Sequence, residues 1–527
     1  MTQKQINKVY VYLQTLNAAL GLVFWMYTSL VFNSCQIYLQ DYVFPDAATS
    51  VFSLIASGPQ MGGIPGALLA GPLSQKIGRR RMLIWLNIIA LVGVVLTIFE
   101  SLPAIIVGRF IQGFVIGAEL VMVPMYVAEM SPVEITGETG ALYMPMSSAG
   151  TQLGFVVGFL MPSNLNDGKE YMWRILFGAA GLPNVIRLIL LLFVFRKETP
   201  FYFIMKDNDT LATDILSKIY SQERIQSELQ RLHEEKKFLA SKNTAGTVTL
   251  KDLFTKKYRK CFFMGLFVSL AWSVSGMNTI FSFSNAMLED TVTEPDSNTP
   301  VLFSTLFGEI DFVACIIAYI LSKTIKRKTA FLLGMILVGI VNSAYGILGL
   351  IEPQSPVLKY ILIIWPLPFE FSIGFIVSTY LSESLPEVGL SVTMVTNNLA
   401  AFLITQFYLS LADTIGHSGI MLALGVCCFL SFFISKAFLV ETKNKSKAEI
   451  LSEYSGIPLD KTNQTEAGQV ISLTEVNPSS PSDTPTEDKL MLENIAKNST
   501  IEKPEGNTKD GSPTNPSMSV EDFEEVG

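Results

Sequence analysis

The sequence predicts an all-α membrane protein with twelve transmembrane helices in two six-helix bundles, followed by a disordered acidic tail. Three observations favour this class: a low share of charge, long apolar stretches and motifs that recur between the two halves. Charged residues make up only 16% of the 527 residues, against about 25% in soluble domains. Residues 451–527 carry 15 acidic and 5 basic residues, whereas residues 1–450 carry 33 basic and 31 acidic. The net charge of −8 therefore comes from the tail and gives no indication of a nucleic-acid partner.

The apolar stretches are long enough to cross a bilayer, which takes about 20 residues of helix. Eight stretches contain no Asp, Glu, Lys or Arg: 9–40, 47–75, 82–99, 139–166, 261–288, 329–351, 388–412 and 414–435. Four more apolar stretches contain a few charges: 101–128, 173–195, 301–322 and 357–382. We therefore expect twelve spans in contact with the lipid bilayer.

Basic residues lie mainly in the connections on one face of the membrane. They include Lys76 and Arg79–Arg81 after the second span, and Lys326 to Lys328 after the eighth. Both termini fall on this face. The positive-inside rule makes it cytoplasmic, and we expect a multi-pass protein of the plasma membrane.

The chain divides into four regions by composition. Residues 1–195 form a first six-span bundle and 261–450 a second, and the polar segment 196–260 between them has patterns typical of short helices. Residues 451–527 are rich in Ser, Thr, Pro, Asn and acids. We expect this tail to be disordered and open to protein partners, because it cannot bury a core.

Short motifs recur at nearly constant spacing between the two bundles. They lie at equivalent helix ends, with offsets of 248, 254 and 243 residues: Leu73–Arg80 with Leu321–Lys328, Tyr126-x-x-Glu129-x-x-Pro132 with Tyr380-x-x-Glu383-x-x-Pro386, and Glu198-Thr199 with Glu441-Thr442. Transporters built from parallel repeats hold their substrate between the halves near the midplane.

Further strings identify a family. They are Gly71-x₆-Gly78-Arg79-Arg80, Gly108-Arg109-Phe110-x₂-Gly113-x₃-Gly117, Pro124–Pro132, Gln152-Leu153-Gly154, Trp173-Arg174, Ser275–Asn278 and Glu441–Lys443. In this order the chain resembles the sugar-porter, glucose-transporter-like branch of the major facilitator superfamily over about residues 10–450. The resemblance implies transport by alternating access.

The resemblance also implies a cytoplasmic gate made of charged residues at helix ends. Its members in the first half are Arg79, Arg80, Arg109, Glu129 and Glu198, and in the second Arg327, Lys328, Glu383 and Glu441. Such pairs latch the gate while the site faces outward and break when it opens inward. Alternatively, the basic groups only anchor helix ends and set topology.

Polar side chains inside the spans are the candidates for substrate binding. By resemblance, Gln152 and Asn278 hydrogen-bond sugar hydroxyls, with Asn397 as a third, and Trp272 replaces a family glutamine and offers a stacking face or fills the pocket. The alternative for these amides is contact between helices.

Ionisable residues inside spans are costly unless they meet a partner or a wet cavity. We expect Asp311 and Glu370 to line the cavity; Asp311 stands where sugar porters often place an asparagine. Glu119 has no evident counterpart, and we expect Arg187 to extend toward a water interface.

The resemblance thus implies a carrier of a hexose or similar small polar solute. Facilitated diffusion is the simpler mode, since the first span lacks the carboxylate that proton-linked sugar porters carry there. The alternatives are a proton-coupled porter for another solute, and a non-transporting nutrient receptor that signals through its tail. We expect no enzyme activity, cofactor or metal, because His233 and His417 are the only histidines and no nucleophile or phosphate-loop motif occurs.

Overall fold

The computed structural model describes residues 6–132, 134–160, 171–244, 249–289, 299–321, 325–443, 445 and 447–457. Every element named within these ranges is a helix, apart from an isolated backbone bridge between Ile6 and Tyr220. The all-α prediction is confirmed. Of the predicted disordered tail, residues 451–455 instead end the last described helix, where Tyr454 is buried, and residues 458–527 lie outside the described residues.

The helices of the first half follow the predicted spans. They are α1 (Lys8–Tyr38), α2 (Thr49–Ile77), α3 (Arg79–Ile98), α4 (Leu102–Met130), the pair α5 (Thr136–Ala141) and α6 (Tyr143–Val156), and the pair α7 (Met172–Ala179) and α8 (Gly181–Phe193). A π-helical turn, Leu39–Val43, extends α1, and a 3₁₀ turn, Val157–Leu160, extends α6. Three helices outside the spans follow: α9 (Pro200–Met205), α10 (Asp209–Ile219) and α11 (Gln222–Thr244).

The second half repeats the pattern with more interruptions. It contains α12 (Arg259–Ser273) with α13 (Met277–Glu289), α14 (Thr299–Leu321), α15 (Arg327–Ile351), then α16 (Val357–Ile364), α17 (Pro366–Pro368), the π-helix η6 (Phe369–Gly374) and α18 (Phe375–Ser384), and finally α19 (Glu387–Phe438) and α20 (Lys447–Ser455).

Within the described residues, eight helical stretches are long and apolar enough to cross a membrane. The longest, Val388–Phe438, contains Gly416 with φ of 72°, where the helix breaks, so it holds two predicted spans. Together with α2, α14 and the α5–α6 pair, these stretches account for the twelve spans. Outer-facing apolar side chains such as Trp85, Leu182 and Phe433 are more than half exposed, as lipid-facing residues are.

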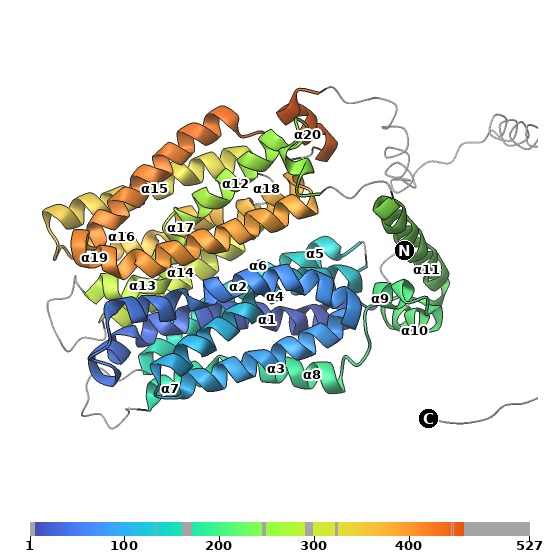
Figure 1. Ribbon diagram of the computed structural model, residues 1–527, viewed down its shortest axis with the longest axis horizontal. Helices are drawn as coiled ribbons and strands as arrows, with labels where there is room; N and C mark the ends of the chain where they lie inside the picture. The colour runs from blue at the N-terminus through green and yellow to red at the C-terminus, as the bar shows by residue number, and fades with distance from the viewer. Residues whose placement is uncertain are drawn as a thin grey trace, which may run out of the picture. The chain divides into compact units, whose positions relative to one another are not determined.

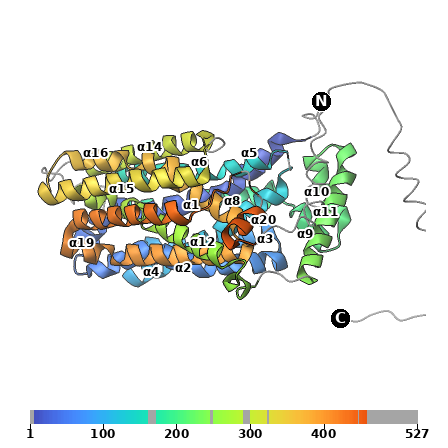
Figure 2. The ribbon, with the colours of Figure 1, turned by 90° about the horizontal axis from the view of Figure 1, so that it is seen from above.

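Close helix packing builds each half. A Cβ on Gly117 of α4 would lie 2.0 Å from the Gly63 carbonyl oxygen of α2, so only glycine lets these two helices approach so closely. The two halves meet where α2 packs on α19, α6 on α14, and α1 on α13. Figures 1 and 2 show the helices of the two halves side by side, with α9–α11 at the end where α5 lies.

We call this end the basic end, because α3 and α15 both begin there, with Arg79 and Arg327 at their first positions. The start of α1 belongs to it too, since the Asn7 amide donates to the Ile219 carbonyl of α10 at 2.8 Å. The other end of the bundles is the opposite end.

Candidate functional site

A cavity of about 1400 Å³ lies between the two halves. Near the middle of the bundles its wall includes Ser148 and Thr151 of the first half and Asn278, Asp311 and Glu370 of the second. Residues close to helix termini at the basic end also line it: Gln75, Glu134, Glu138, Ser382 and Ser391. The cavity therefore extends from the centre of the molecule to the basic end.

Hydrogen bonds between the halves close the opposite end. Asn33 of α1 donates through Nδ2 to Ser284 Oγ of α13 at 2.8 Å, and its Oδ1 accepts from the Asn285 amide at 3.2 Å. Nearby, Ser57 Oγ of α2 donates to Gln406 Oε1 of α19 at 2.8 Å. One end is thus sealed by polar contacts while the other is open.

Most of the predicted binding residues line this cavity. They are Trp272, Asn278, Asp311, Glu370 and Asn397. They come from different helices of the second half, and short breaks position two of them: Asn278 follows Gly276, whose φ is 102°, and Glu370 lies in the π-helix η6. Both breaks turn a helix where it meets the cavity, as π-helical turns at functional sites often do.

The amides differ in their partners. Asn397 Oδ1 accepts a hydrogen bond from Ser273 at 2.6 Å, so this side chain joins α19 to α12 within one half. The Trp272 indole nitrogen is buried without a partner among the described residues. Asn397 thus makes the contact between helices that was the alternative to substrate binding. The Trp272 N–H is a buried donor whose partner is not among the described residues.

Gln152 is the predicted binding residue that does not line the cavity. Its Oε1 is buried and lies beside Gly308, where an added Cβ would approach it to 2.7 Å. Gln152 therefore packs at the contact of α6 with α14, between the halves. Its sequence position one residue after Thr151, which does line the cavity, turns it about 100° away around the helix.

Sequence reasoning missed two features of the first half. Ser148 Oγ donates to Asp311 Oδ2 at 2.7 Å and so joins the halves beside the cavity. Arg187 does not reach an interface: it is fully buried, its Nη1 donates to Glu119 Oε2 at 2.8 Å and its Nε to Asn87 Oδ1 at 2.9 Å. The sequence around each of these residues is apolar and does not indicate which distant residue it contacts.

At the basic end the first half carries a compact charge cluster. Arg79 Nε lies 2.8 Å from Glu129 Oε1, and Thr199 Oγ1 donates to Glu129 Oε2 at 2.5 Å. The Glu198 carboxylate accepts from the Arg80 and Arg81 amides at 2.9 and 2.8 Å, which caps the first turn of α3. The Arg80 guanidinium donates to the Phe195 and Leu191 carbonyls.

The second half carries the same arrangement. Arg327 Nη2 lies 3.1 Å from Glu383 Oε1, and Thr442 Oγ1 donates to Glu383 Oε2 at 2.6 Å. Glu441 accepts from the Arg327 and Lys328 amides at 2.9 and 3.1 Å at the start of α15. The repeated motifs of the sequence therefore build the same contacts twice.

Each ion pair joins helix ends within one half, as expected. Both pairs are formed in this structure although the cavity reaches this end of the bundles. Arg109 is not part of either cluster: its Nε donates to the Ile55 carbonyl at 3.0 Å, and it lies 20 residues before Glu129, about 30 Å along α4.

The helices after the first half dock at the cavity mouth. Arg224 of α11 lies 2.6 Å from the carboxylate of Glu134, which lines the cavity. Lys197 donates to Asp214 of α10 at 2.5 Å, and this hydrogen bond holds the pKa of Asp214 below its usual range.

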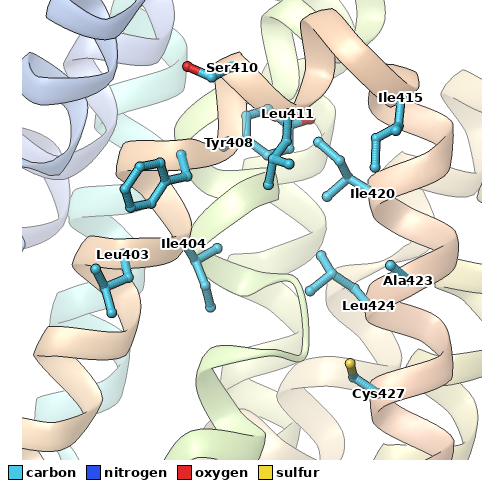
Figure 3. Close-up of a pocket in the computed structure, with 11 residues that line it drawn as sticks. Leu403, Ile404, Tyr408, Ser410, Leu411, Ile415, Ile420, Ala423, Leu424 and Cys427 are labelled. Carbon is cyan, nitrogen blue, oxygen red and sulfur yellow. The ribbon is translucent and has the colours of Figure 1, made fainter.

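A second, smaller cavity of about 570 Å³ lies beside the break in α19 (Figure 3). Leu403, Leu411, Ile415 and Leu424 line it, and the first three are among the exposed apolar side chains. It offers an apolar surface on the outer face and few polar groups, so the central cavity is the candidate site for a polar solute.

Comparisons with known proteins place this fold. A family model described as "Sugar (and other) transporter" matches residues 13–454. Facilitated glucose transporter member 1 of solute carrier family 2 from Gallus gallus is 26% identical over 463 residues, covering 82% of this chain and 91% of the relative. The major myo-inositol transporter IolT of Bacillus subtilis (strain 168) is 26% identical, covering 79% and 89%.

Two solved structures of one protein share the architecture. The xylose transporter XylE from E. coli in a partially occluded inward open conformation aligns with a TM-score of 0.70 at 18% identity, over 82% of this chain and all of XylE. The proton:xylose symporter XylE bound to 6-bromo-6-deoxy-D-glucose aligns with a TM-score of 0.69 at 20% identity, covering 85% and 100%. The chain thus has the fold of the major facilitator superfamily, as predicted.

Proposed function

Because the chain belongs to the sugar (and other) transporter family, we propose that it carries a hexose or similar small polar solute across a membrane by alternating access. The observation that carries this proposal is a cavity lined by both halves, with polar side chains from each half in its wall, sealed by hydrogen bonds at one end and reaching the other. A binding site between two such halves is accessible from one side at a time.

The basic end faces the cytoplasm in this proposal. The positive-inside rule assigns loops rich in Lys and Arg to that side, and the starts of α3 and α15 carry them. Both chain termini then lie in the cytoplasm, the protein sits in the plasma membrane, and the structure corresponds to an inward-open state.

We assign binding to the second-half residues of the central cavity. Asn278 is half-buried, lines the cavity and presents both a donor and an acceptor to hydroxyls. Trp272 supplies an aromatic face and a buried N–H. Asn397 contributes through its amide donor, which its bond with Ser273 does not use. Gln152 contributes to binding from the contact between the halves, outside the cavity lining.

The clusters at the basic end act as braces in this proposal. Each ties three helix ends of one half together, through Arg79 and Glu129 in the first half and Arg327 and Glu383 in the second. A braced half moves as a rigid body, which alternating access requires. Arg109 braces the far part of α4 through backbone carbonyls of α1 and α2.

The test is uptake of labelled hexoses, a pentose and inositol by purified protein in liposomes. We expect equilibration of at least one sugar, and a loss of about tenfold in Asn278→Ala, equivalent to roughly one to two lost hydrogen bonds to the ligand. Asn208→Ala in the turn before α10, outside the cavity, is the matched control and should keep full uptake. Absence of uptake for every solute, with correct insertion verified, contradicts the proposal.

A further inference from the structure

The central cavity is acidic. Its lining contains four carboxylates, Asp311 and Glu370 in the middle and Glu134 and Glu138 at the mouth, and no Lys, Arg or His among the described lining residues. Glu134 is neutralised by Arg224, and Glu138 accepts a hydrogen bond from Tyr12. In the middle of the cavity, Asp311 and Glu370 have no counter-charge among the described lining residues.

Asp311 is built into the wall with one oxygen unused. Its side chain is buried, Oδ2 accepts from Ser148, and Oδ1 has no partner among the described residues. Glu370 lines the same cavity and has no hydrogen bond or ion pair with another described residue, and it interacts electrostatically with Asp311. Cys315, one turn after Asp311, lines the same cavity.

The surrounding helices supply no cation. The elements that pack on α14 are α6, α13, α16, α17, α18, η3 and η6, with η3 being Val157–Leu160. Lys359 of α16 is the one basic residue in the described parts of these elements, and its ammonium lies 5.0 Å from the ring of Phe303, outside the cavity lining. The buried Arg187 is already bound to Glu119.

Two carboxylates in a low-dielectric wall repel each other and favour a cationic partner. A protonated amine has three donors and no acceptor, which matches groups that are acceptors only. A neutral sugar offers hydroxyl donors but brings no positive charge to this acidic wall. Trp272 on the same cavity adds an aromatic face, which attracts a cation as well as an apolar ring face.

We propose that the solute is a polyhydroxylated amine, such as an amino sugar, whose ammonium group binds between Asp311 and Glu370. This inference rests on the proposed transport function and specifies its substrate class. Asn278 binds the hydroxyl groups, and the amine supplies the positive charge that the cavity wall lacks.

The experiment compares three ligands of one size class in proteoliposomes: glucosamine, glucose and N-acetylglucosamine, at pH 6.5, where a primary amine is protonated. We expect wild-type protein to take up glucosamine at least about tenfold faster than the two neutral sugars, since a charge-assisted contact contributes about 1.5 kcal/mol or more. A membrane potential negative inside the vesicle should accelerate glucosamine uptake and leave glucose uptake unchanged.

The variant Asp311→Asn keeps the size of the side chain and its bond to Ser148 but removes a charge. We expect it to lose the preference for glucosamine, while Glu352→Gln, which is exposed and outside the cavity, retains it. The ligand preference of the wild type decides the matter even if the variant fails to fold.

Three results overturn the inference. The first is uptake of glucose that is as fast as or faster than uptake of glucosamine. The second is glucose uptake that acidifies the vesicle lumen in the wild type but not in Asp311→Asn, because the two carboxyl groups then carry a proton rather than an amine. Absence of uptake for all three sugars overturns the transport proposal itself, and so is distinguishable from loss of amine selectivity.

Discussion

The two halves carry the same polar contacts at the basic end and different ones in the middle of the membrane. Arg79–Glu129–Thr199 and Arg327–Glu383–Thr442 are nearly superposable in chemistry. At mid-membrane the first half pairs Arg187 with Glu119 and binds Arg109 to backbone carbonyls, away from the cavity lining. The second half leaves Asp311 and Glu370 facing a cavity whose described lining holds no cation.

This difference separates scaffold from site. A motif retained in both halves stabilises a helix end that both halves need. A charged group found in one half only, lining a cavity and left without an opposite charge, is expensive in a bilayer and points to a ligand. Asn87 and Asn342 belong to the scaffold by the same criterion. Both are buried on corresponding helices, α3 and α15, and each hydrogen-bonds to a side chain of its own half.

The largest expected effect is in the buried pair of the first half. Glu119→Ala leaves Arg187 as an uncompensated buried charge, so we expect a loss of about 3–5 kcal/mol in the free energy of unfolding. Thermal unfolding in detergent measures it. The double variant Glu119→Leu/Arg187→Met should recover most of this loss. For comparison, Asp311→Asn should change the free energy of unfolding by less than about 1 kcal/mol, because Ser148 still donates to the remaining oxygen. A stable Glu119→Ala protein contradicts the pairing.

The more deeply buried of the two ion pairs at the basic end, Arg79–Glu129 and Arg327–Glu383, should contribute more to stability. The side chains of Arg79 and Glu129 are 7% and 13% exposed, and those of Arg327 and Glu383 are 15% and 28% exposed. We expect Arg79→Ala to reduce stability by about 2 kcal/mol and Arg327→Ala by about 1 kcal/mol, since water screens the second pair more. Chemical denaturation of the two variants, with the exposed Arg196→Ala as control, tests the order. The reverse order would show that burial does not set the strength of these clusters.

The smallest effect concerns the repeated tyrosines. Tyr126 of α4 receives a hydrogen bond from Gln14 of α1 at 3.3 Å, and Tyr380 of α18 pairs with Tyr454 of α20 at 2.5 Å. We expect Tyr454→Phe to cost about 1 kcal/mol in the free energy of unfolding, because it removes the bond to Tyr380 and the acceptor of the Val440 amide, and we expect Gln14→Ala to cost less.

Removing residues 458–527 should leave both stability and uptake unchanged. A loss of uptake in that truncation would favour a receptor that signals through its tail.

The sequence was a good guide wherever the physics is local or repeated. Spans follow from the length of apolar stretches, and the clusters around Glu129 and Glu383 follow from motifs that occur twice. Asp311 and Glu370 were found because a charge inside a span is costly without a partner or water. Each of these signals resides in one short segment of chain.

The contacts that were missed join distant segments. Ser148 and Asp311 lie in different halves, and Glu119 and Arg187 lie in helices whose rotation about their axes a sequence does not specify. The same rotation turns Gln152 to the contact between α6 and α14, beside Gly308. For Arg109, the position along α4 was misjudged, because the family motif that contains it begins near the opposite end of the helix.

The most direct measurement is the accessibility of position 278 from each side of the membrane. It uses Asn278→Cys in a protein whose native cysteines are replaced, since Cys315 also lines the cavity. We expect a membrane-impermeant thiol reagent to label position 278 from the basic side in one state and from the opposite side in another, with solute shifting the ratio. Labelling from one side alone under every condition would contradict a site that alternates between the two compartments.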